Sequence, residues 1–168
     1  MNEWIEELSD ISATGERAVL VTVARIRGSA PRETGAKMIV TESETVGTIG
    51  GGQLEYQCTR IAASMLDDEE GAALQTFSLG SDMGQCCGGV VDVLFEPVCT
   101  RLPHWLTELR ATHGQRLPAV LVTELAEGER YGKRVASGAE ADELLGDKRD
   151  ARIENGCFYE PIIASDMH

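Results

Sequence analysis

The sequence predicts an α/β fold in which a mixed β-sheet is flanked by helices. Segments rich in β-branched residues alternate with amphipathic segments along the chain, which is typical of this fold class. Two strand-like segments are nearly identical, AVLVTV at 18–23 and AVLVTEL at 119–125, and this likeness suggests a common sheet rather than a true repeat. A short turn at Glu42 and Ser43 joins two extended segments as a hairpin, so the sheet is expected to be mixed.

The first quarter of the chain contains one helix and three strands. Apolar residues recur from Trp4 onward at the spacing of one helical face, which predicts an amphipathic helix over 3–13. Residues 18–26 are β-branched and mostly apolar, as in a strand buried on both faces. Two further strands are expected at 36–41 and 45–49, on either side of the turn.

The next helix follows three consecutive glycines. Its apolar residues recur from Leu54 to Met65 as one continuous stripe, which predicts a helix packed against the sheet. The later elements are less distinctive. We expect helices at 101–112 and 140–145, and strands at 73–79, 90–95, 119–125, 133–137 and, as an edge strand, 158–163.

Composition narrows the class of protein. The 168 residues carry 15 basic and 28 acidic side chains, a net charge of −13, which argues against binding to nucleic acid or to an anionic membrane. The N-terminus resembles no secretory signal, and no apolar run approaches the roughly 18 residues of a membrane span. Five scattered cysteines, an odd number, favour reduced thiols in a cytoplasmic protein.

A glycine-rich turn between a strand and a helix is the first candidate site. Residues 47–55 read GTIGGGQLE, and the glycines allow positive φ and close approach of a ligand to the backbone. The helix start behind them favours a phosphate or a carboxylate. The spacing fits neither a Walker loop nor a Rossmann fingerprint. A turn that merely packs strand against helix explains the same residues, and a capping role explains Glu55 at least as well as catalysis.

A cluster of basic residues is the second candidate. Five of the fifteen basic residues fall within 17–37, beside a single acid, Glu33: they are Arg17, Arg25, Arg27, Arg32 and Lys37. In a chain of charge −13, this local reversal of sign would attract an anion. The alternative is that these cations pair with the surplus carboxylates of the surface.

A pair of adjacent cysteines is the third candidate. Residues 84–89 read GQCCGG, a glycine-flanked loop in which one thiolate of Cys86 or Cys87 could act as a soft metal ligand or a sulfur acceptor. Two thiols alone do not complete a zinc site, and the three histidines have no useful spacing to them. Two small buried residues at a tight turn remain the alternative.

Four segments in this order resemble the XdhC/CoxI family of molybdoenzyme accessory proteins. They are GSAPR at 28–32, GAKM at 35–38, GTIGGGQLE at 47–55 and GQCCGG at 84–89. Together they cover a motif-bearing core of about 18–97, and residues 1–163 are expected to form the N-terminal domain of the family, followed by a tail at 164–168. The family usually continues into a C-terminal Rossmann-like domain at this point, so the chain is either a fragment or a naturally short member.

The resemblance implies a chaperone with no turnover of its own. Such a protein binds the molybdenum cofactor (molybdopterin), supports its sulfuration with a cysteine desulfurase, and delivers it to apo-xanthine dehydrogenase or a related hydroxylase. A homodimer is possible. Cys86 is the first choice for a thiolate near molybdenum, and Cys87 is the second. The residues expected to bind the cofactor are Ser29, Arg32, Lys37, Gly50, Gly51, Gly52, Gln53, Glu55, Gln85, Cys86, Cys87 and Gly88.

Two other functions remain compatible with the residues alone. A nucleotide- or phosphometabolite-binding enzyme would use the glycine-rich turn as its anion site. A thiol redox or metal-sensing module would use Cys86 and Cys87.

Overall fold

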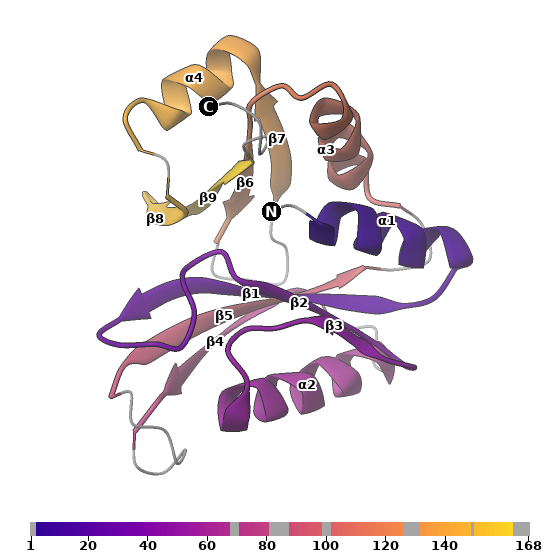
Figure 1. The fold of residues 1–168 in the computed structure, drawn as a ribbon, viewed down its shortest axis with the longest axis vertical. Helices are drawn as coiled ribbons and strands as arrows, with labels where there is room; N and C mark the ends of the chain where they lie inside the picture. The colour runs from indigo at the N-terminus through magenta and orange to yellow at the C-terminus, as the bar shows by residue number, and fades with distance from the viewer. Residues whose placement is uncertain are drawn as a thin grey trace.

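The computed structural model shows two lobes, each an antiparallel sheet with helices (Figure 1). In the first lobe the sheet order is β3-β2-β1-β5-β4, and in the second lobe it is β7-β6-β9-β8. The structure describes residues 3–67, 71–80, 88–98, 102–125, 132–148 and 150–162.

The first lobe contains two helices and five strands, and α2 covers the sheet face turned away from the second lobe (Figure 1). Its strand β1 lies between β2 and β5, so both of its edges are hydrogen-bonded. The elements are α1 (Glu3–Thr14), β1 (Ala18–Arg27), β2 (Lys37–Thr41), β3 (Thr45–Gly47), α2 (Gly52–Asp67), β4 (Ala73–Ser78) and β5 (Val90–Val98).

The second lobe is smaller, and its helix α3 lies beside α1 where the lobes meet (Figure 1). Its central strands are β6 and β9, which pair with each other. The elements are α3 (His104–Gly114), β6 (Ala119–Glu124), β7 (Lys133–Ser137), α4 (Gly138–Leu145), β8 (Arg152–Glu154) and β9 (Cys157–Ile162).

The buried apolar residues form three cores, one within each lobe and one between the lobes. One lies between α2 and the first sheet and includes Val19, Val21 and Leu54. A second joins the lobes, because it combines residues of α1 and β1 with residues of α3 and β6. The third lies between α4 and the second sheet. Strand β1 is therefore buried on both faces, as the sequence predicts, by α2 on one side and the second lobe on the other.

The α/β class is confirmed, and the sheet arrangement differs from the prediction. All strand pairs in the described residues are antiparallel, and they form two sheets rather than one mixed sheet. The near-identical strands β1 and β6 do not share a sheet. The edges of β1 are taken by β2 and β5, and β6 pairs with β7 and β9, so that Leu20 of the first sheet and Leu121 of the second pack in one core between the two sheets.

The C-terminal elements differ from the prediction in detail. Strand β9 was expected at an edge, but it lies between β6 and β8. The short edge strand β8 carries no alternating pattern long enough to predict it. The helix expected at 101–112 begins at His104, and Pro103 is its N-cap. Of the helices in the described part of the chain, none is both long and apolar enough to cross a membrane.

Candidate functional site

Three of the four motif segments meet at one end of the first lobe. A β-carbon on Gly50 would lie 2.5 Å from Cγ of Pro31, so the glycine-rich turn packs directly against the 28–32 loop. A β-carbon on Gly89 would lie 2.0 Å from the carbonyl oxygen of Ser29. The 28–32 loop therefore touches both glycine loops, and we call the three segments 28–32, 47–52 and 88–89 the loop cluster.

The glycine-rich turn needs glycine for its backbone conformation. Gly50, Gly51 and Gly52 have φ values of +121°, +73° and +65°, a region that residues with a β-carbon rarely adopt. This run of positive φ turns the chain from β3 into α2. Gly52 and Gln53 then begin α2 on its exposed side, beside the loop cluster.

The carboxylate of Glu55 occupies the inner side of this turn. Its Oε2 accepts hydrogen bonds from the amides of Ile49 and Gly51, both at 3.0 Å, and from the hydroxyl of Thr48 at 2.5 Å. These donors are the groups that the sequence offered to an external anion. The structure therefore gives Glu55 the capping role, and a phosphate would meet a site that already holds a negative charge.

The pKa of Glu55 reflects these hydrogen bonds. Partial burial disfavours the ionised form, but the hydrogen bonds from Thr48 and the loop amides outweigh it, so the pKa of Glu55 is lowered. The unfolded chain has the ordinary value of about 4.3. The contribution of Glu55 to stability is thus present above about pH 4.3 and is lost as the pH falls through the lower folded value.

We expect Glu55→Gln to destabilise the protein at neutral pH and much less in acid. The variant keeps the shape of the side chain but loses the charge that the loop amides stabilise. Thermal unfolding from about pH 7 down to about pH 3 checks this, with Glu42→Gln in the exposed turn as a control. A difference from the wild type that stays constant with pH would contradict the capping role.

The predicted basic cluster is largely neutralised by carboxylates. Arg25 and Arg27 both pair with the buried Asp92, at 3.0 and 2.8 Å. Arg32 pairs with its neighbour Glu33 at 3.2 Å, and Lys37 pairs with Glu160 at 2.9 Å. The pairing alternative thus describes these four side chains. Arg32 differs from the others because its partner is 70% exposed, and such a pair is weak.

Lys37 is buried in the contact between the lobes. Its side chain is 4% exposed, and its Nζ donates a hydrogen bond to the hydroxyl of Thr22 at 2.9 Å. The same ammonium lies 4.9 Å from the ring centre of Trp4. Burial lowers the pKa of Lys37, although the carboxylate of Glu160 acts in the opposite direction.

The predicted thiol site lies outside the described residues: Gln85, Cys86 and Cys87 belong to the segment 81–87. The described part of that motif is Gly88, which is exposed, and Gly89, which is buried against Ser29. Among the described residues, no group of three or more histidine, cysteine or acidic side chains is placed to hold a metal ion.

Cys58 on α2 is a buried thiol outside the motif segments. Burial, with a smaller effect of the nearby Glu55 carboxylate, raises the pKa of Cys58 to about 12. We therefore expect Cys58 to resist alkylation in the folded protein at pH 8, where about one thiol in 10⁴ is ionised. Peptide mapping after iodoacetamide treatment checks this, with urea-unfolded protein as the control. Labelling of Cys58 at the rate of the unfolded chain would contradict it.

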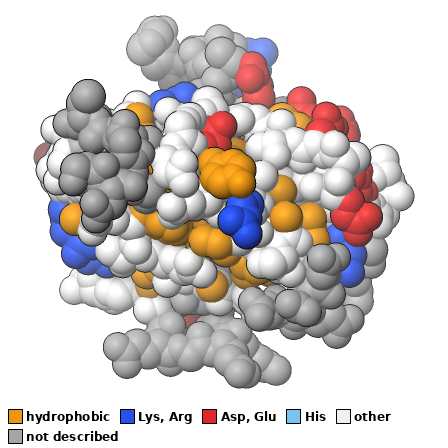
Figure 2. All heavy atoms as spheres, turned by 90° about the horizontal axis from the view of Figure 1, so that it is seen from below, with side chains coloured by type: hydrophobic (Ala, Val, Ile, Leu, Met, Phe, Trp, Pro, Cys, Tyr) orange, Lys and Arg blue, Asp and Glu red, His pale blue; other side chains and the backbone are white. Residues whose placement is uncertain are grey.

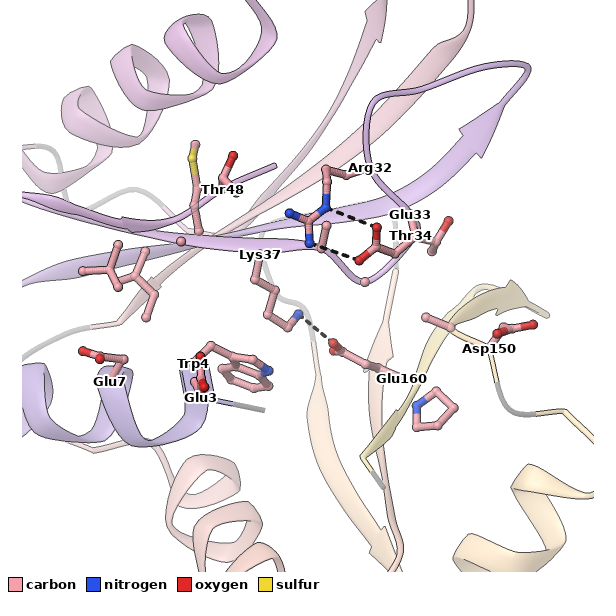
Figure 3. Close-up of a pocket in the computed structure, with 18 residues that line it drawn as sticks. Glu3, Trp4, Glu7, Arg32, Glu33, Thr34, Lys37, Thr48, Asp150 and Glu160 are labelled. Carbon is pink, nitrogen blue, oxygen red and sulfur yellow. Dashed lines mark hydrogen bonds and ion pairs between the residues drawn. The ribbon is translucent and has the colours of Figure 1, made fainter. Parts of the chain in front are cut away.

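A pocket of about 580 Å³ opens beside the loop cluster, between the two lobes (Figure 3). Arg32, Glu33 and Thr48 line one side of it, and Trp4, Lys37 and Glu160 line another. Its volume is that of a small-molecule site. Acidic side chains outnumber basic ones in the lining, which adds Glu3, Glu7 and Asp150 to those already named.

The face of the first lobe that carries α2, turned away from the second lobe, has apolar side chains at its surface (Figure 1, Figure 2). Figure 2 shows hydrophobic side chains across the middle of this face and acidic side chains toward one edge. Tyr56, on the helix that begins in the loop cluster, is 58% exposed. Hydrophobic side chains thus gather at the middle of this face, among basic and acidic ones (Figure 2).

Sequence reasoning missed the residues of the second lobe that reach this region. Glu160 closes the pocket and pairs with Lys37, but an isolated glutamate in a weakly patterned strand carries no signal of its own. The sequence predicts Trp4 only as part of the apolar face of a helix. Trp4 does pack against the core between the lobes, and it also lines the pocket. The sequence signal that could have identified Glu160 is the recurrence of FEPV at 95–98 as YEPI at 159–162.

The fold and the loop cluster define a class: a two-lobed α/β protein with glycine-rich loops gathered at one end. Residues 11–78 match the XdhC and CoxI family, and the resemblance inferred from the motifs is confirmed over that range. The matched range includes the segments 28–32 and 47–55 and ends before the cysteine pair.

The fold is also similar to a solved structure. A protein from Bacillus halodurans, described as a xanthine dehydrogenase, matches with a TM-score of 0.72 and 24% sequence identity, over 95% of this chain and 52% of that chain. At this identity the similarity shows a shared fold. This chain spans about half the length of that protein. No curated protein matches the sequence.

Proposed function

We propose that this chain is an accessory protein that binds the molybdenum cofactor, supports its sulfuration and delivers it to an apo molybdenum hydroxylase such as xanthine dehydrogenase. The observation that carries the proposal is the packing of the 28–32 loop against both glycine loops. The glycine-rich turn, Arg32 and the end of the thiol loop thereby share one surface. The family match over residues 11–78 supports the same class of cargo.

Arg32 is the side chain best suited to the phosphate of the cofactor. Its side chain is 40% exposed, and among the described residues its partner is the exposed carboxylate of the adjacent Glu33. A phosphate dianion forms stronger charge-assisted hydrogen bonds with a guanidinium than a solvated carboxylate does, so it would displace Glu33. Ser29 and Gln53 lie exposed in the same cluster and offer further donors.

The pocket beside Arg32 suits the pterin ring. A pterin is flat and heteroaromatic, and its 2-amino-4-oxo edge presents adjacent N–H donors that a carboxylate accepts. The pocket supplies the Trp4 ring and the Glu33 and Glu3 carboxylates, at about 580 Å³. An acidic lining that would repel a simple anion is therefore compatible with a cargo that combines a phosphate with a donor-rich ring.

The thiols complete the proposed cargo site. The thiol loop returns to the cluster at Gly88 and Gly89, beside Ser29. Cys86, with Cys87 as second choice, would supply a soft thiolate ligand near molybdenum. A cysteine desulfurase would supply the sulfur, and this chain would hold the cofactor during the exchange and the transfer to the hydroxylase.

An anaerobic titration with molybdenum cofactor tests the proposal. We expect molybdenum and pterin to co-elute with the protein on gel filtration in stoichiometric amount. Arg32→Ala should lose the cofactor, and Cys86→Ala should weaken its retention, whereas Arg134→Ala in the second lobe should bind like the wild type. Elution of free cofactor from a folded chain, and from a longer chain that includes any C-terminal domain, would overturn the proposal.

A second measurement separates the cofactor from simpler phosphates. A panel of nucleotides in a thermal-shift assay should leave the unfolding temperature unchanged, because the loop amides already bind Glu55. A ligand at 100 times its dissociation constant would add about 2.7 kcal/mol to stability, which such an assay detects. Stabilisation by a nucleotide would favour the phosphometabolite enzyme instead.

A further inference from the structure

The two lobes begin with the same sequence pattern at the same spacing. Trp4 precedes the AVLVT of β1 by 14 residues, and Trp105 precedes the AVLVT of β6 by 14 residues, a constant offset of 101. Within the two helices, Leu8 corresponds to Leu109 under this offset, and both are fully buried in the core that joins the lobes.

The two sheets have equivalent strand orders and registers. Strands β2-β1-β5-β4 of the first sheet correspond to β7-β6-β9-β8 of the second. Thr22 stands opposite Lys37 between β1 and β2, and Thr123 stands opposite Lys133 between β6 and β7. Leu20 stands opposite Glu96, just as Leu121 stands opposite Glu160.

The division of each strand between two cores is also the same. Val19 and Val21 face α2, and the corresponding Val120 and Val122 face α4. Ala18, Leu20 and their counterparts in β6 all enter the core between the lobes. The helices thus occupy the same side of each unit.

The buried lysine of each lobe pairs with a buried glutamate of the other lobe. Lys37 of the first lobe pairs with Glu160 of the second at 2.9 Å, and Lys133 of the second pairs with Glu96 of the first at 2.6 Å. Each lysine also lies over the tryptophan of its own lobe, at 4.9 and 4.7 Å. Trp4 and Trp105 meet between them, with ring centres 6.5 Å apart.

We propose that the chain is an internal duplication of one α-β-β-α-β-β unit and that the inner face of each lobe is a docking surface whose partner is the other lobe. The reciprocal ion pairs are what a twofold axis between two copies of one surface produces, since each contact then occurs twice. A single lobe packed against an unrelated layer gives no reason for the second pair.

The duplication also explains where the candidate site lies. In the first lobe, residues 48–51 join β3 to α2 and residues 79–89 join β4 to β5. In the second lobe, α4 begins directly after Ser137, and the two-residue turn of Asn155 and Gly156 joins β8 to β9. Among the described residues, the second lobe thus has no counterpart of the glycine-rich turn before α2 or of the long connection from β4 to β5, and Lys37, which has a counterpart in Lys133, belongs to the docking surface.

Cleavage of the full chain between the lobes tests the proposal, whether or not the protein binds the cofactor. A protease site inserted between residues 100 and 101 is cut after the protein has folded. We expect the two pieces to co-elute on gel filtration at the volume of the uncut chain. Separate elution of the two pieces would overturn the proposal.

Mirror variants test the symmetry itself. In the cut protein, Lys37→Glu and Lys133→Glu should each cause dissociation, and Glu160→Lys and Glu96→Lys, respectively, should restore co-elution. If a reversal prevents the uncut chain from folding, Glu160→Leu and Glu96→Leu replace it and should each cause dissociation, and the addition of Lys37→Met and Lys133→Met, respectively, should restore co-elution. A clear effect at one ion pair and none at its mirror would overturn the duplicated surface.

Discussion

Replacing Glu160 with leucine is expected to lower the free energy of unfolding by about 3–5 kcal/mol. Glu160 and Lys37 are 8% and 4% exposed, so the substitution leaves an ammonium buried without its carboxylate. The remaining hydrogen bond to Thr22 and the contact with Trp4 do not replace the lost charge pairing. Chemical denaturation of the full chain measures the effect.

Two further variants serve as controls for this prediction. Removing both charges, with Lys37→Met and Glu160→Leu together, should recover most of the lost stability, because two apolar side chains need no pairing. Arg134→Ala, which removes an ion pair whose members are 50% and 53% exposed, should cost at most about 1 kcal/mol. A double variant less stable than the single one would refute the account of Lys37 as a paired, buried charge.

Replacing Gly89 with alanine is the second change for which we expect a large effect, about 3 kcal/mol of lost stability. The added β-carbon would lie 2.0 Å from the carbonyl oxygen of Ser29 and 3.0 Å from that of Arg27. Both neighbours are backbone atoms, so β1 or the loop after it would have to move. Chemical denaturation measures the loss, and the 28–32 loop would separate from the thiol loop.

Gly88→Ala is the matched control for this prediction. It changes the adjacent residue of the same motif, and its β-carbon would meet nothing within 4 Å. We expect stability close to that of the wild type. If the proposed function holds, Gly89→Ala should also release the cofactor. Equal stability of the two variants would show that the packing of Ser29 against Gly89 is not tight in solution.

The local elements could be predicted because their signals are short-range. Apolar spacing predicted α1 and α2 to within a few residues, and β-branched runs predicted β1 and β6. The short strand β8 was missed, since three residues contain no usable period. The position of β9 was wrong because its pattern predicts a strand but not its neighbours.

The candidate site was predicted in part for the same reason. The glycines of 28–32, 47–52 and 88–89 signalled unusual backbone, and the structure brings these segments together. The anion site at the start of α2 was expected from the helix terminus, but whether an internal carboxylate fills it depends on the rotamer of Glu55. Three cations of the basic cluster pair with Asp92 or Glu160, which are distant in sequence.

The repeat of AVLVT shows most clearly where sequence reasoning ends. The sequence by itself determined the elements, the glycine turns and the family of residues 11–78, because these depend on neighbours along the chain. Only the tertiary structure decided that β1 and β6 lie in separate sheets and that their lobes exchange Lys37–Glu160 and Lys133–Glu96. Identical strands have identical pairing potential, so the choice between one sheet and two rests on which edges are already occupied and on which apolar faces remain to be buried.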